Sequence, residues 1–208
     1  FSRDWKMDQV EQVSNINPYA SASKTMNTHL HLLEAYTSLY RVWKDDGLED
    51  KLKEHIHVMV ERIVNHENWH YMLYFDAGWQ SQSPDISYGH DIEGSWLLWE
   101  AAEIIGDSEL EEFVRPVSLK MAEAVFDNGW HPDGGIIYET DPEKGTVQDF
   151  RSWWVQSEAL VGFYNAWQLG GEDKYLKATL DVYEFIDEEL TDHENGGWYP
   201  NAISDNRQ

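Results

Sequence analysis

A helical hydrophobic period recurs in three stretches of this chain, and each stretch predicts two helices joined by a short turn. The turns are expected at Asp45-Asp46-Gly47, Gly106-Asp107 and Gly170-Gly171, because glycine and aspartate commonly end one helix and begin the next. The pattern favours an all-α fold made of antiparallel helical hairpins. The expected helices cover residues 24–44, 48–64, 90–105, 109–126, 151–169 and 172–190.

The three hairpins also share sequence features, which indicates an internal repeat. Glu34, Glu93 and Glu158 lie in similar contexts in the three first helices, at intervals of roughly 60 residues. A longer loop containing a Gly-Trp pair follows each hairpin, and residues 71–75 and 135–138 within these loops are expected to form short strands. A single hairpin has too little core to be stable, so such units bury their faces by stacking.

Two architectures fit stacked hairpins: an open α-solenoid, or a closed toroid of the (α/α)6-barrel type. Polar side chains recur near the start of each first helix, and in a toroid these helices form the inner ring, so that their starts converge on one cavity. This recurrence favours the toroid. Because three hairpins are too few to close such a ring, residues 1–208 are expected to form one domain that is a partial (α/α)6 barrel, with residues 1–20 as the end of an earlier repeat. The recurring polar residues are Asn27, His31, His90, Glu93, Gln156 and Glu158.

Composition narrows the possible partners. The net charge of −24 argues against a nucleic-acid or anionic-membrane surface, and no apolar run approaches the roughly 20 residues of a membrane helix. The chain has no cysteine, so disulfides and thiolate chemistry are excluded for this sequence, and a cytoplasmic location is predicted. The 11 tryptophans could build the helical core, or could offer the flat apolar faces on which sugar rings stack.

His90 and Glu93 are the strongest candidates for chemistry. Residues three apart share one helical face, so both side chains point the same way at the loop-facing end of their helix. The pair would suit a general acid/base histidine tuned by a carboxylate, or a fragment of a metal site. Their ordinary interpretation is a helix-start histidine and a first-turn acid favoured by the helix dipole. The His31–Glu34 pair repeats the pattern, although His31 could simply be a buried histidine on an apolar face.

Four motifs, in order along the chain, resemble those of the N-acylglucosamine 2-epimerase superfamily. They are Asn27-x-x-x-His31-Leu-Leu-Glu34-Ala35, Gly89-His90-Asp91-Ile92-Glu93, Pro132-Asp133-Gly134-Gly135 and Trp153-Trp154-Val155-Gln156-Ser157-Glu158-Ala159. The segment Tyr88-Gly-His-Asp-Ile-Glu is most similar to the cellobiose 2-epimerase branch. The motifs extend from about residue 18 to the end of the chain.

The resemblance implies an (α/α)6 barrel without metal or cofactor that inverts C2 of a reducing-end sugar by removing and returning a proton. The implied enzyme interconverts glucose-type and mannose-type reducing ends. The implied catalytic residues are His90 as one acid/base, Glu93 as its partner, and His31 in ring opening or intermediate stabilisation. The implied substrate-binding residues are Asn27, Glu158 and either Trp153 or Trp154, which would stack on a sugar ring. The implied partner is a small-molecule sugar, with no nucleic acid and no membrane.

Two elements of the family pattern are not matched. Family members carry a second C2 histidine in a Tyr-His-Asn-like segment, and no such segment follows Trp198-Tyr199-Pro200 here; an arginine of an early helix is also unmatched. The sequence is therefore expected to be a fragment that is poorly active alone.

Three other functions remain open from the sequence. An aldose–ketose isomerase of the same superfamily would form the same enediolate and return the proton to C1. A glycoside hydrolase on the same barrel would use two carboxylates, here Asp91 and Glu93. A non-catalytic repeat scaffold or sugar-binding module would use neither the enediolate chemistry nor the two carboxylates. The other histidines, His70 and His131 among them, are expected on the surface or in loops, with His29 facing away from His31.

Overall fold

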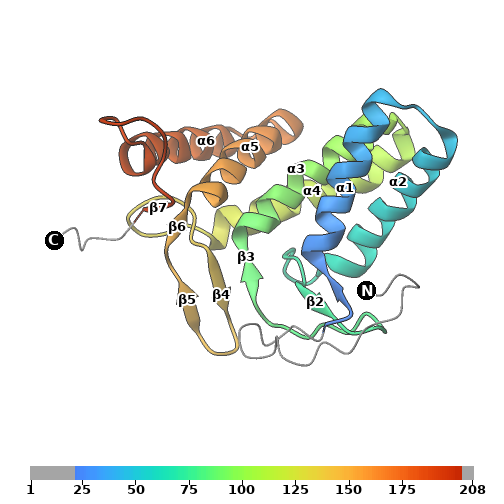
Figure 1. The fold of residues 1–208 in the computed structure, drawn as a ribbon, viewed down its shortest axis with the longest axis horizontal. Helices are drawn as coiled ribbons and strands as arrows, with labels where there is room; N and C mark the ends of the chain where they lie inside the picture. Colours follow the sequence, from blue (N-terminus) through green and yellow to red (C-terminus); the bar gives the residue numbers. More distant parts are fainter. Residues whose placement is uncertain (1–21, 203–208) are drawn as a thin grey trace.

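The computed structural model describes residues 22–202, and its helices form three antiparallel hairpins in the predicted order (Figure 1). The all-α expectation is confirmed, and the helix limits differ from the predicted ones by only a few residues. The segment 1–20, expected to end an earlier repeat, lies outside the described residues. The hairpins are α1 (Met26–Val42) with α2 (Asp46–Val58), α3 (Tyr88–Ile105) with α4 (Ser108–Asn128), and α5 (Trp153–Gly170) with α6 (Asp173–Phe185).

The first turn lies two residues earlier than predicted, at residues 43–45. Asp45 is the N-cap of α2 and accepts a hydrogen bond from Leu48 N, so Asp46 and Gly47 already belong to the helix. The predicted turn at Asp45-Asp46-Gly47 is wrong because the first of its two aspartates acts as a helix cap. The outer helices α2 and α6 both end in a π-helical turn, at Met59–Ile63 and Ile186–Leu190.

The second turn follows the prediction. Gly106 ends α3 in the left-handed region with φ of 75°, a conformation that glycine adopts at little cost. Asp107 then caps α4 by accepting hydrogen bonds from the backbone nitrogens of Glu109 and Leu110.

The first helices of the hairpins are neighbours. Helix α3 packs against α1 on one side and α5 on the other, while α2 packs on α3 and α4 packs on α5. Inner helices thus touch one another, and the outer helices α2 and α4 each contact the next inner one, as in a sector of a helical toroid. One apolar core joins the first two hairpins and includes Leu33, Met59 and Leu98. A second core, around Phe163 and Val182, joins the last two.

Short strands lie at the ends from which the inner helices start, along the lower side of Figure 1. The small sheets pair β1 with β2, β3 with β4 and β5, and β6 with β7, all antiparallel. Strands β1, β3 and β6 each lead directly into an inner helix. The strands are β1 (Lys24–Thr25), β2 (Tyr74–Phe75), β3 (Ile86–Ser87), β4 (Glu139–Asp141), β5 (Thr146–Gln148), β6 (Arg151–Ser152) and β7 (Asn201–Ala202).

The loop strands are only partly where they were expected. Of residues 71–75, Tyr74 and Phe75 form β2, while Tyr71 makes an isolated bridge with Val64. Of residues 135–138, only Ile136 makes a bridge, with Trp130, and the strand β4 begins one residue after the predicted one ends.

Two inner helices anchor the loop of the preceding hairpin through the fourth residue of the helix. The buried Asp91 of α3 accepts hydrogen bonds from Tyr71 N at 2.7 Å and from His70 Nδ1 at 2.8 Å. Gln156 of α5 is also buried, and its side-chain amide binds both the N–H and the carbonyl of Ile136 at 2.7 Å. Each anchor satisfies backbone or side-chain groups that would otherwise be buried without a partner.

The second anchor corrects one prediction. Gln156 is among the side chains predicted to converge on a cavity, but its amide binds Ile136 and the Ser152 carbonyl instead. His70 lies in a loop, as expected, and is buried there, with its side chain 5 % exposed and paired with Asp91. His131 is also largely covered, and its Nδ1 accepts from Arg151 Nη1 at 2.7 Å.

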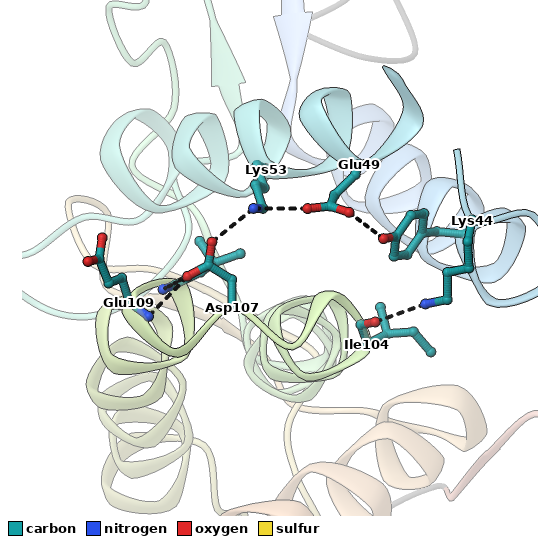
Figure 2. A network of polar contacts seen from close by, with 8 residues as sticks. Lys44, Glu49, Lys53, Ile104, Asp107 and Glu109 are labelled. Carbon is teal, nitrogen blue, oxygen red and sulfur yellow. Dashed lines mark hydrogen bonds and ion pairs between the residues drawn. The ribbon is translucent and has the colours of Figure 1, made fainter. Parts of the chain in front are cut away.

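A chain of polar contacts joins the first two hairpins at the end away from the strands (Figure 2). Tyr40 donates to Glu49 at 2.5 Å, and Lys53 contacts Glu49 at 3.0 Å and Asp107 at 2.8 Å. Lys44 donates to the Ile104 carbonyl at 3.0 Å. These contacts fix α2 to the α3–α4 turn. Among the described residues, no helix is long and apolar enough to cross a membrane.

Candidate active site

His90 lies in the first turn of α3, with both ring nitrogens in contact with side chains from different strands or helices. Ser87 Oγ, at the end of β3, lies 2.7 Å from Nδ1. Asn27 Nδ2, in the first turn of α1, lies 3.0 Å from Nε2. The Trp154 ring of α5 packs beside the imidazole with centroids 4.9 Å apart. The three inner helices therefore all contribute to the surroundings of this one histidine.

A cavity of about 320 Å³ opens beside His90. One side of its wall comes from α1 and β2, and the other from β3 and the start of the β4–β5 hairpin. The lining residues are Thr25, Met26, Asn27, Leu73, Tyr74, Ser87, His90, Tyr138 and Glu139. Hydrogen-bonding groups and aromatic rings thus line the same space, as in many sites for small polar ligands.

A second row of polar side chains lies about one turn further along the inner helices. His31 Nδ1 lies 3.1 Å from Glu34 Oε2 on α1, and Glu158 of α5 accepts a hydrogen bond from Trp96 Nε1 of α3 at 2.9 Å. Glu93 lies close enough to Glu158 and Glu34 for their charges to affect its pKa. The structure therefore brings His31, Glu93 and Glu158 onto one face with His90.

The electrostatics of this face favour neutral forms of its two central groups. Burial, with a smaller effect from His31, lowers the pKa of His90 to about 4. Burial, followed by the negative charges of Glu158 and Glu34, raises the pKa of Glu93 to about 8. Near pH 7 His90 is thus an unprotonated imidazole and Glu93 is mostly a carboxylic acid. A neutral base lies one helical turn from a group that can donate a proton.

The hydrogen-bond partners of His90 differ from the expected carboxylate. Glu93 shares its helix face, but the ring nitrogens of His90 contact Ser87 and Asn27. Glu34 and Glu158 instead contact the side chains of His31 and Trp96.

The two candidate stacking tryptophans lie differently. Trp154 is partly buried between His90 and Tyr138, with its ring at right angles to the tyrosine. Trp153 is 49 % exposed, and its backbone N–H binds the Pro200 carbonyl. Trp154 is therefore the tryptophan beside His90. His29 faces away from His31 as predicted and stacks on His55 with centroids 5.5 Å apart.

Sequence reasoning missed most of the residues that line this cavity, including three polar ones that come from strands or loops. Ser87, Tyr138 and Glu139 all lie just before an inner helix or in the loop that precedes one. The strand pairing of Ser87 with Glu139 brings the β4–β5 hairpin over the cavity, and this pairing leaves no periodic signal in the sequence. The placement of Ser87 three residues before His90 was the one available indication.

The two carboxylates proposed for a glycoside hydrolase do not share a cleft. Asp91 is 0 % exposed and turned toward the His70 loop, whereas Glu93 faces Glu34 and Glu158. Within residues 22–202, no group of three or more histidine, aspartate or glutamate side chains is arranged to hold a metal ion.

Comparison with known proteins supports the same family as the motifs. The chain is 43 % identical over 198 residues to the cellobiose 2-epimerase of Bacteroides fragilis. The matched region covers 95 % of this chain and 50 % of that protein. The chain is 35 % identical over 206 residues to the enzyme of the same name from Ruminococcus albus, covering 99 % and 52 %. The chain spans about half the length of the curated relatives it matches.

The fold matches solved relatives as well. The structure of cellobiose 2-epimerase from Bacillus thermoamylovorans superimposes with a TM-score of 0.87 at 35 % identity, covering 97 % of this chain and 50 % of that one. The family description N-acylglucosamine 2-epimerase, or GlcNAc 2-epimerase, matches residues 3–208. With its four motifs, its helical-barrel fold and this match over nearly the whole sequence, the chain belongs to the N-acylglucosamine 2-epimerase family.

Proposed function

We propose that this chain carries part of the active site of a sugar 2-epimerase that interconverts glucose-type and mannose-type reducing ends. Two relatives of 43 % and 35 % identity are named cellobiose 2-epimerase. By that likeness the substrate is a β-1,4-linked disaccharide such as cellobiose, held with its reducing end in the cavity beside His90.

The observation that carries the proposal is a neutral histidine base in the wall of a polar cavity. In an open-chain aldose the C1 carbonyl makes the proton on C2 removable. His90 Nε2 takes that proton, and the electrons of the C–H bond form the enediolate. Return of a proton to the opposite face of C2 inverts the centre. We assign His90 to one face of C2 only.

The neighbouring groups fit the charge that develops in this step. An enediolate oxygen needs hydrogen-bond donors, and Glu93 supplies one because its raised pKa keeps it protonated near neutral pH. His31 is assigned to ring opening or to the same oxygen. Asn27 and Glu158 bind sugar hydroxyls, and the Trp154 ring stacks on a sugar face.

The test uses the protein encoded by the complete reading frame that contains this sequence. It is incubated with cellobiose in deuterated water, and the product is examined by NMR. The expected product is the C2 epimer with deuterium at C2, formed equally well after chelator treatment. A ketose product with deuterium at C1 would instead indicate the isomerase, and product without solvent deuterium would contradict proton exchange at C2.

Two variants locate the base. His90→Ala is expected to lower turnover by about 10²–10⁴-fold, the usual contribution of a general acid/base. His57→Ala is the matched control, because His57 is an exposed histidine of the outer helix α2 that contacts Glu61 and Phe113. Equal losses in the two variants would contradict the assignment of His90.

A further inference from the structure

The three inner helices begin at equivalent hydroxyl residues, and two of these, Ser87 and Ser152, do not cap their helix with the side chain. Thr25, Ser87 and Ser152 are the N-cap residues of α1, α3 and α5, each at the end of a short strand. Thr25 caps its helix in the ordinary way by accepting a hydrogen bond from Thr28 N at 3.2 Å. Ser87 makes no capping hydrogen bond with its side chain. Its Oγ lies instead 2.7 Å from His90 Nδ1.

The contacts of His90 determine where its single proton resides. The Asn27 amide nitrogen is a donor only, so at 3.0 Å from Nε2 it must donate to that nitrogen. An Nε2 that accepts a hydrogen bond has its lone pair free of a proton. In a neutral imidazole the proton is then on Nδ1, and it is donated to Ser87 Oγ.

The surroundings also hold Ser87 in place. Ser87 as a whole residue is 2 % exposed, and its backbone pairs with Glu139 of β4. A buried hydroxyl on a paired strand is a fixed acceptor, because it cannot turn to solvent. The imidazole is therefore held by Ser87 on one edge, by Asn27 on the other, and by the Trp154 ring on its face.

We propose that Ser87 is a positioning residue that keeps the proton of His90 on Nδ1, so that Nε2 at the cavity is the basic nitrogen. As a role in catalysis this rests on the proposed function; as a statement about the tautomer it does not. When substrate enters, Asn27 can turn its amide to a sugar hydroxyl, and Nε2 is left unpaired and aimed at C2. Ser87 keeps its contact throughout.

The test compares Ser87→Ala with two matched variants. Ser87→Thr keeps the hydroxyl, and threonine already occupies the equivalent position at Thr25. Ser152→Ala removes the equivalent serine of α5, which makes no capping hydrogen bond with its side chain and does not contact His90. The tautomer of His90 is read from the ¹⁵N shifts of its ring nitrogens, a measurement that needs no turnover. C2 deuterium exchange with cellobiose gives kcat and KM for the complete protein.

We expect the wild type, Ser87→Thr and Ser152→Ala to show the Nδ1–H form. Ser87→Ala should show a mixture with the Nε2–H form. Its kcat should fall about 10–100-fold with little change in KM, as when a partner that fixes a histidine tautomer is lost. An Nε2–H form in the wild type, or an unchanged tautomer in Ser87→Ala, would overturn the proposal. A tautomer change in a protein that never exchanges C2 would support the role of Ser87 and refute the epimerase.

Discussion

Gly162 of α5 faces Ile92 of α3 where the second and third hairpins meet, with no room for a side chain between them. A β-carbon on Gly162 would lie 2.5 Å from Ile92 Cγ1 and 2.9 Å from the Ile92 carbonyl oxygen. The carbonyl belongs to a helix backbone and cannot turn aside. The close approach of the two inner helices therefore depends on glycine at this position.

Gly162→Ala is expected to destabilise the chain. Alanine favours a helix interior by about 1 kcal/mol over glycine, but overpacking of a helix contact costs about 1–3 kcal/mol. We expect a net loss of up to about 2 kcal/mol in the free energy of unfolding, measured by urea denaturation. Gly170→Ala in the same helix is the control, because its nearest neighbour is a mobile Leu119 methyl at 3.1 Å. Equal effects of the two substitutions would contradict the steric argument.

Removal of the Asp91 anchor should cost more than any surface change. Asp91→Ala leaves His70 Nδ1 and the Tyr71 N–H buried without their acceptor, at about 1–3 kcal/mol for each buried group. Asp91→Asn keeps an oxygen for the Tyr71 N–H and should cost less. Urea midpoints of the two variants check this order. A milder effect of alanine than of asparagine would show that the pair is not stabilising.

Gln156 offers a test of the second anchor that separates its two hydrogen bonds. Gln156→Ala orphans the N–H and the carbonyl of Ile136, at about 1–3 kcal/mol for each buried group. Gln156→Glu keeps the acceptor for the N–H but has no donor for the carbonyl, so it should also destabilise. Hydrogen exchange of the Ile136 amide should speed up in the alanine variant. Unchanged protection of this amide would mean that contacts other than the Gln156 hydrogen bonds hold the loop in place.

The stability of the chain should fall as pH rises from 6.5 to 8, because of Glu93. Between pH 4.5 and 8 the folded chain keeps a proton on Glu93 that the unfolded chain has lost, so unfolding releases it and stability declines with pH. His90 acts in the opposite direction between pH 4 and 6.5, where only the unfolded chain binds its proton. Above pH 6.5, of these two groups only Glu93 still contributes to the pH dependence.

Glu93→Gln should remove this decline. The slope of the free energy of unfolding against pH should change by at most about 1.4 kcal/mol per pH unit, the value for one proton. Urea unfolding of both proteins at pH 6.5, 7 and 8 measures the difference, in which the titration of groups not coupled to Glu93 cancels. Parallel curves for wild type and variant would mean that Glu93 is already ionised at neutral pH.

The sequence allowed the helices to be predicted because their causes are local. The hydrophobic period, the cap at Asp107 and the left-handed Gly106 each act within one turn of chain. Convergence of Asn27, His31, His90 and Glu93 could also be predicted, since the repeat places them at equivalent positions on inner helices. Their pKa values could not, because these depend on burial by neighbouring hairpins.

Other features of the site depend on tertiary structure. Gln156 and Asp91 resemble catalytic side chains in the sequence, and only the packed loop shows that they are anchors. Ser87 resembles an ordinary helix cap, and only the distance to His90 reveals another role. Tyr138 and Glu139 reach the cavity through strand pairing between segments about 50 residues apart, for which one sequence offers no periodic signal.

The two loop anchors also determine where this chain can be cut and joined to a relative to make a stable chimera. Helices α3 and α5 each complete the hairpin before them, so the unit that closes its own hydrogen bonds is a hairpin with its loop and the start of the next helix. The boundaries of this unit differ from those of the sequence repeat, because each sequence repeat begins at an inner helix. Chimeras between relatives that are cut in the hairpin turns, at Gly106 or Gly171, keep each anchor with its loop, whereas cuts just before an inner helix separate them.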